Sequence, residues 1–181
     1  GYNTSGTLTW TNGWLSALHR GTEFSSSGTP VLNLSSAIPV TSREQRNNLG
    51  FLSRLNRIHQ RRLPREVELE ARIQNYELAA RMQLAAADVL DISGETAETL
   101  ALYGVGKGPT DNFGRMCLLA RRFAERGVRF VQASHSYKWD QHGNLKAGHQ
   151  RNALEVDLPI AGLLRDLKRR GLWDDTLVLW A

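Results

Sequence analysis

Three of the five histidines in this chain of 181 residues fall within one segment, 134–150, which reads SHSYKWDQHGNLKAGHQ. His135, His142 and His149 are accompanied there by Asp140. Imidazole and carboxylate are the ligands that Zn²⁺, Mn²⁺ and similar divalent ions prefer where no thiolate is available. A D-x-H pair in a loop can turn both side chains toward one point, and Gly143 lets the chain bend just after it. The spacing therefore predicts a metal site centred on Asp140 and His142.

A structural role is the alternative for each of these residues. A histidine that follows a strand is commonly a hydrogen-bonded structural residue, and Asp140 could instead cap a local turn. Trp139 could pack beneath the loop and fix it. The single cysteine, Cys117, excludes an intrachain disulfide and cannot form a thiolate cluster by itself. Its apolar neighbours, FGRMCLLA, predict a buried structural thiol.

The elements that flank this segment decide where it would lie. Residues 112–126 are predicted to form an amphipathic helix that ends at Gly127, followed by a short strand at 128–133 (VRFVQA). After the histidine-rich loop, a second amphipathic helix is predicted at 154–170 and another strand at 176–180 (TLVLW). Strands joined in this way are expected to be parallel in one sheet, where ligands bind at the carboxyl ends of strands. The predicted fold class is α/β.

The first half of the chain carries no comparable motif. Residues 1–40 are rich in Gly, Ser, Thr and Asn and are predicted to be an ordered, loop-rich segment, with a short helix at 13–18 and an extended piece at 31–34. Residues 41–90 are predicted to form a helical hairpin, with Ser42 as the N-cap of its first helix. The turn-rich connection that follows contains GVGKGPTDNFG, which lacks the spacing and the preceding strand of a phosphate loop.

Composition narrows the class of partner. The net charge of +5 could suggest nucleic acid, but only Arg54–Arg65 is densely basic, and that stretch contains no aromatic side chain to stack on bases. We therefore expect a solvated helix end there and no nucleic-acid partner. No apolar run approaches the roughly 20 residues of a membrane span. The chain starts without methionine and ends in an apolar run, which we expect of an internal piece of a longer domain.

Several stretches carry a resemblance to a known family: ELEARIQNYELAARMQ, FGRMCLLARRFAERGVRFVQ, WDQHGN and EVDLPIAGLLRDLKRRGLWDDTLVLW. They resemble the domain of unknown function 1501 family, which is sulfatase-like and lies within the alkaline phosphatase superfamily. The likeness covers nearly the whole chain. It implies that residues 1–181 are part of one domain, truncated at both ends, with a partial, helix-rich three-layer α/β/α sandwich whose core is residues 112–181.

The resemblance also implies roles for individual residues. Asp140 and His142 fall where the superfamily places metal-binding Asp and His, although D-x-H is shorter than the D-x-x-x-H of its phosphatases. His149 is a third candidate ligand for a divalent ion, which would be Zn, Mn, Ca or Mg. His135 and Lys138 match strand-end residues that contact the substrate oxyanion in sulfatases, so a catalytic role is implied for both.

The resulting hypothesis is a fragment of a metal-dependent hydrolase of phosphate or sulfate esters. Its substrate would be a small-molecule or polymeric anionic ester, and an extracytoplasmic setting is expected from the resemblance alone. The nucleophile and the remaining ligands are expected outside this chain, so the fragment by itself is not expected to catalyse efficiently. The alternative is a non-catalytic, metal-containing binding module for sulfated or phosphorylated polymers. Substrate, metal identity and oligomeric state stay open.

Overall fold

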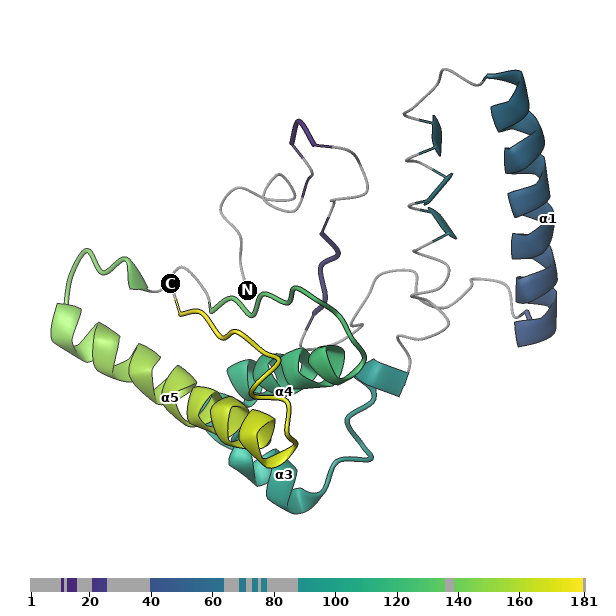
Figure 1. The fold of residues 1–181 in the computed structure, drawn as a ribbon. Helices are drawn as coiled ribbons and strands as arrows, with labels where there is room; N and C mark the ends of the chain where they lie inside the picture. The colour runs from purple at the N-terminus through teal and green to yellow at the C-terminus, as the bar shows by residue number, and fades with distance from the viewer. Residues whose placement is uncertain are drawn as a thin grey trace. The chain divides into compact units, whose positions relative to one another are not determined.

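The computed structural model describes residues 11, 13–15, 21–25, 40–63, 69–70, 73–74, 76–77, 88–135 and 139–180. These residues belong to two compact units (Figure 1). Residues 89–180 lie in one unit, and the described residues up to Asp88 lie in the other. Within the described residues, no helix is both long enough and apolar enough to cross a bilayer.

In the described part of the unit at 89–180, the main elements are helices. They are α3 (Ala97–Leu102), the short 3-10 helix η3 (Gly108–Thr110), α4 (Asp111–Glu125) and α5 (Leu145–Arg169). α4 packs along α5, and both η3 and α3 also contact α5. The core between these helices consists of Tyr103, Phe113, Cys117, Leu118 and Val156. The apolar faces of the two amphipathic helices are therefore buried against each other.

Two glycines allow the helices to pack closely. A Cβ atom at Gly162 in α5 would lie 2.4 Å from the carbonyl oxygen of Leu102, and one at Gly114 in α4 would lie 2.3 Å from that of Tyr103. Both distances are too short for any other residue, so α4 and α5 pack directly onto the backbone at the end of α3.

Both long helices end as their glycines predict. Gly127 has φ +79° and Gly171 has φ +70°, a left-handed conformation that glycine adopts without strain. After α4, the amide of Gly127 donates to the carbonyl of Ala124, and that of Val128 donates to Phe123. This pair of hydrogen bonds is a Schellman motif, and it satisfies carbonyls that the end of the helix leaves unpaired.

A buried ionic network, which we call the Arg121 network, joins α4, α5 and the residues before α3. Arg121 is nearly fully buried, and its guanidinium pairs with Glu125 at 2.6 Å, Glu95 at 2.8 Å and Asp166 at 3.0 Å. Asp166 is fully buried and also accepts a hydrogen bond of 3.0 Å from the Tyr103 hydroxyl. Removing charge from water is costly, and here each buried charge has opposite charges around it.

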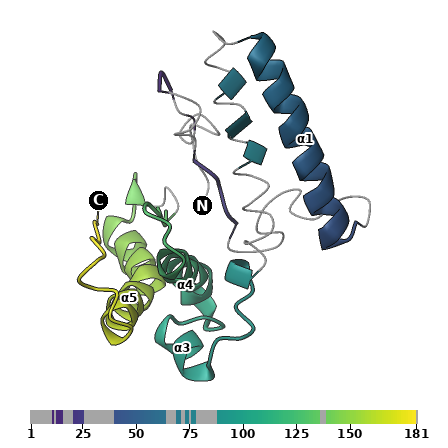
Figure 2. The same ribbon diagram turned by 45° about the vertical axis from the view of Figure 1, so that its right-hand side comes forward.

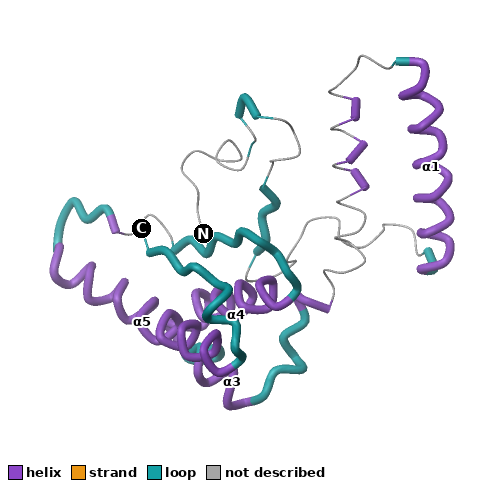
Figure 3. The backbone as a smooth tube through the Cα atoms, in the orientation of Figure 1, coloured by secondary structure: helices purple, strands orange, loops and turns teal. Residues whose placement is uncertain are grey.

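The α/β prediction is wrong for the part of the chain that the structure describes. Residues 128–133 and 176–180, predicted to be parallel strands, are irregular or extended and pair in no sheet; Figure 3 draws both as loop. An extended segment becomes a strand only when another strand satisfies its N–H and C=O groups. No such partner lies among the described residues, and Phe130 and Leu179 leave about four-fifths of their side chains exposed (81% and 80%).

The helix boundaries also differ from the prediction in one important place. α5 begins at Leu145 rather than at residue 154, so it takes in nine residues that were expected in the loop. Asn144 starts the helix from a left-handed conformation (φ 51°), and its carbonyl accepts from the amide of Gly148. Pro159 lies buried inside α5, where it supplies no N–H for the helix. The connection before α4 contains α3 and η3 rather than turns alone.

The other unit contains α1 (Ser42–Arg62). Its N-cap is Thr41, one residue before the predicted Ser42, in a capping box in which the Thr41 hydroxyl and the Glu44 carboxylate each cap the other's backbone N–H. α1 lies beside the short helical pieces 69–70, 73–74 and 76–77 in Figures 1 and 2. Ser53 of α1 donates to Glu77 at 3.0 Å. The helical hairpin predicted for 41–90 stays a prediction. The predicted pieces at 16–18 and 31–34 lie outside the described residues.

Candidate functional site

The candidate metal ligands Asp140 and His142 lie in the loop that leads into α5. Between them, Gln141 is half-buried, and its amide lies against Gly148, where a Cβ atom would meet the Gln141 Oε1 at 2.3 Å. Its two neighbours in the chain lie on the solvent side of the loop instead. The side chains of Asp140 and His142 are 81% and 87% exposed.

The two outward side chains meet each other. The Oδ2 atom of Asp140 lies 3.1 Å from the Nε2 atom of His142. Two ligands on a tetrahedral ion with bonds of about 2.0–2.1 Å stand roughly 3.3 Å apart. The two side chains would offer one carboxylate oxygen and one imidazole nitrogen to a divalent ion in place of their contact with each other. Among the described residues, no third His, Cys, Asp or Glu joins this pair to complete a ligand set.

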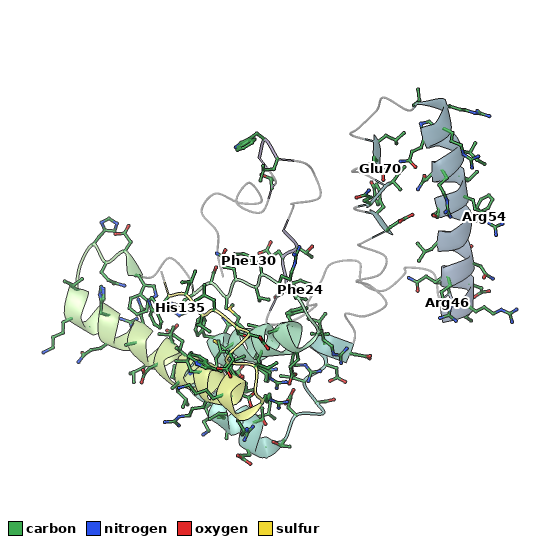
Figure 4. All side chains as sticks on the ribbon, in the orientation of Figure 1. Phe24, Arg46, Arg54, Glu70, Phe130 and His135 are labelled. Carbon is green, nitrogen blue, oxygen red and sulfur yellow. The ribbon has the colours of Figure 1, made fainter. Side chains whose placement is uncertain are left out.

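His135, predicted to be catalytic, is held in a separate cluster on the inner side of the loop, and Figure 4 shows it labelled above α5. Its Nε2 atom lies 2.8 Å from Oε2 of Glu155 in α5, and its Nδ1 atom accepts a hydrogen bond of 3.0 Å from the indole N–H of Trp139. The imidazole also packs edge-on against Phe113 of α4, with ring centroids 5.5 Å apart.

These contacts fix the tautomer of His135. An indole N–H only donates, so Nδ1 must be unprotonated, and Nε2 carries the hydrogen that it donates to Glu155. Both ring nitrogens are thus engaged within the protein. An oxyanion would gain a hydrogen bond from this imidazole only if Nε2 left Glu155.

His149, the third candidate ligand, is in the first turns of α5 rather than in the loop. Its Nδ1 atom donates to the carbonyl of Leu145 at 3.0 Å, and its ring packs edge-on against Trp139 at 5.6 Å. A histidine that donates from Nδ1 to a backbone carbonyl presents a lone pair at Nε2, which is the form that binds metal ions. The structure does not bring it into the Asp140–His142 pair. Lys138 lies outside the described residues.

Two parts of this arrangement were not predicted from the sequence. Glu155 was not considered, although it lies next to the buried face of α5, beside Asn152 and Val156. Trp139 was expected to fix the loop by packing. Its indole N–H also sets the tautomer of His135, because it donates to Nδ1. Helix periodicity could have placed Glu155 near the inward face, but its pairing with a residue 20 positions earlier is a long-range contact that no local pattern encodes.

Two other predictions concern residues outside the loop. Cys117 is buried as predicted, and burial raises the pKa of its thiol to about 12.

In the GVGKGPTDNFG stretch, the amide of Gly106 donates to Asp111 at 2.6 Å. This hydrogen bond, followed by Arg115, outweighs partial burial and lowers the pKa of Asp111. The Asp111 carboxylate thus accepts a hydrogen bond from a backbone N–H that a phosphate loop would direct at its ligand.

A family model described as "Protein of unknown function (DUF1501)" matches residues 1–181. The chain belongs to this family. No curated protein and no solved structure matched the DUF1501 chain. The family resemblance found in the sequence is thereby confirmed across the full length, and the structure adds a loop in which one histidine–carboxylate pair faces solvent and another is held inside.

Proposed function

We propose that Asp140 and His142 bind one divalent ion and that the protein uses this site in the hydrolysis of phosphate or sulfate esters. The observation that supports the proposal is the 3.1 Å separation of two donor atoms on side chains that are almost fully exposed. Two exposed polar side chains that contact each other gain little from that contact in water. A site of this kind is open to an ion and to an anionic ester bound to it.

In this proposal, the chain's own residues divide the work between binding and positioning. Asp140 and His142 supply two ligands, and further residues, water or the ester itself would supply the others. The Glu155–His135–Trp139 chain of hydrogen bonds fixes the residue directly before Asp140 to α5. When bound, the ion would polarise the ester oxygen and lower the pKa of a nucleophile or water. Donation to the developing oxyanion by Lys138 and His135 stays a prediction.

A second candidate is a metal-containing module that binds sulfated or phosphorylated polymers without hydrolysing them. The engaged state of His135 favours it, because neither ring nitrogen is free to donate to a reacting oxygen. Both candidates use the same ion and the same anionic ligand chemistry, and turnover distinguishes them.

Equilibrium dialysis of the full chain against Zn²⁺ or Mn²⁺ tests the shared part of the proposal. His142→Ala and Asp140→Asn should each weaken binding at least about tenfold, since each removes or weakens a ligand. His59→Ala, which removes an exposed histidine from α1, is the matched control and should leave binding unchanged. Equal affinity of His142→Ala and the unaltered chain would overturn the assignment.

Hydrolysis of 4-nitrophenyl phosphate and 4-nitrophenyl sulfate by the metal-loaded chain separates the two candidates. The hydrolase candidate requires turnover that disappears in Asp140→Asn together with the bound ion. The binding-module candidate requires metal-dependent retention of a sulfated polysaccharide with no release of nitrophenol.

A further inference from the structure

α1 has three distinct faces along its length. Residues at helical spacing share a face, and five of them are half-buried and form one stripe: Gln45, Leu49, Ser53, Asn56 and Gln60. The hydrogen bond from Ser53 to Glu77 shows that this stripe is turned toward the short helical piece 76–77. The two remaining faces are exposed, and they differ sharply in character.

One exposed face is apolar. Phe51, Leu55 and Ile58 follow one another at the spacing of a single helix face, and Leu52 lies beside them. Their side chains are between 44% and 62% exposed. Four large apolar side chains in a row along a helix form a continuous strip, which differs from the scattered apolar residues of an ordinary surface.

The other exposed face is strongly basic. α1 carries six arginines and one carboxylate. The arginines are exposed: Arg43, Arg46, Arg54, Arg57, Arg61 and Arg62. Figure 4 shows Arg54 on the side of α1 turned away from Glu70. The one carboxylate, Glu44, is taken up in the capping box with Thr41. Within the described part of the chain, no carboxylate forms an ion pair with these arginines.

We propose that α1 binds the surface of an anionic lipid membrane, lying in the plane of the interface. The strip Phe51–Leu55–Ile58 would enter the boundary between headgroups and acyl chains, and Arg54, Arg57 and Arg61 beside it would contact lipid phosphates or carboxylates. Helices that bind in this way combine Phe and Leu on one face with Lys and Arg on the other, and attraction to anionic lipids adds to the burial of apolar area.

Geometry and chemistry favour a membrane over two other anionic partners. A nucleic acid would use the arginines, but its phosphate backbone offers nothing to an apolar strip. An acidic protein that encloses a helix needs most of the helix circumference, and the stripe containing Ser53 is already turned toward Glu77. A flat surface needs only the side that α1 leaves exposed.

Co-sedimentation of the full chain with lipid vesicles tests the proposal. Binding is expected to vesicles of phosphatidylcholine containing phosphatidylserine, to weaken as salt is raised, and to be much weaker with pure phosphatidylcholine. Phe51→Glu should reduce binding at least about tenfold, because it replaces an inserted apolar side chain with a charge that the anionic surface repels. Arg54→Gln and Arg57→Gln should each reduce it about fivefold.

Matched variants make the test specific. Leu154→Glu in α5 alters a side chain of similar exposure (66% against 62% for Phe51) and should bind like the unaltered chain. Phe51→Leu keeps the apolar strip and should keep binding, which separates loss of insertion from loss of folding. Equal binding to both kinds of vesicle, or a Phe51→Glu protein that binds as well as the unaltered one, would overturn the proposal. So would preferential binding to a DNA duplex that Phe51→Glu leaves intact.

Discussion

The Arg121 network and the Asp140–His142 pair both bring side-chain nitrogen atoms against carboxylate oxygens, yet they do different things. Asp166 and Arg121 are almost completely buried, and each touches several partners. Asp140 and His142 are more than four-fifths exposed, and each touches the other. A buried charge must be compensated by fixed neighbours, so it determines packing. An exposed pair contributes little to stability, and its donor atoms remain available to a ligand.

The strongest test of this contrast is to remove the central cation of the buried network. Arg121→Met should lower the free energy of unfolding of the unit at 89–180 by about 3 kcal/mol, because Asp166 and Glu95 would lose their most buried cationic partner and keep only the more exposed Arg122, Arg169 and Arg170. Hydrogen exchange of the α4 and α5 amides would measure the free energy of unfolding for that unit alone. Arg126→Met, at an exposed position just after α4, should change it by less than about 0.5 kcal/mol. Equal losses of stability in Arg121→Met and Arg126→Met would contradict the structural role of the Arg121 network.

Acidification should weaken the same network by a smaller amount. Burial alone would raise the pKa of Asp166, but Arg170 and Tyr103, which hydrogen-bond to it, and Arg121 outweigh burial and hold it below the ordinary value of 3.8. The pKa of Glu95 is likewise held below 4.5, because Arg122 and Arg121 outweigh its burial.

Both carboxylates therefore bind protons less readily in the folded chain than in the unfolded one. Their contribution is complete above the ordinary pKa values and is lost as the pH falls below them toward the lowered folded values. Exchange protection of α4 and α5 should decrease over that range. Exchange protection should change less with pH in Arg121→Met than in the unaltered chain. Protection that stays constant down to about pH 3 would contradict the assignment.

The smallest expected changes in stability distinguish the His135–Glu155 pair from the Asp140–His142 pair. His135→Ala should destabilise the unit by about 1–2 kcal/mol, since it leaves the half-buried Glu155 and the indole N–H of Trp139 without their shared partner. His142→Ala should stay within about 0.5 kcal/mol. Tryptophan fluorescence would report the release of Trp139 in the first variant. A His142→Ala protein that is the less stable of the two would reverse the comparison.

The sequence predicted those features that depend on neighbours along the chain. The 3.6-residue periodicity of Phe113, Met116 and Cys117 places α4 correctly, and Gly127 marks its end. The first residues of α5 were missed because LKAGHQ has no apolar periodicity, and the helix there rests on the left-handed start at Asn144 and on Gln141 packed at Gly148. The Asp140–His142 contact followed from a two-residue spacing and was within reach of sequence reasoning.

Features that depend on distant partners were not predicted. VRFVQA and TLVLW have the residue types of strands, but a strand exists only with a partner, and the described residues provide none. The sequence gives no hint that Glu155 would meet His135, or that Arg121 would meet both Glu95 and Asp166, because each contact depends on how the helices pack. The packing of Gly114 in α4 and Gly162 in α5 onto the backbone at the end of α3 is of the same kind.

Pro159 divides α5 into two segments with different roles. Because its nitrogen carries no hydrogen, the carbonyl of Glu155 loses its donor within the helix, at the residue whose side chain fixes the candidate site. The part of α5 before Pro159 carries His149 and Glu155, and the part after it carries Asp166. The helix therefore lacks one backbone hydrogen bond between the turn that holds His135 and the turn that anchors the Arg121 network.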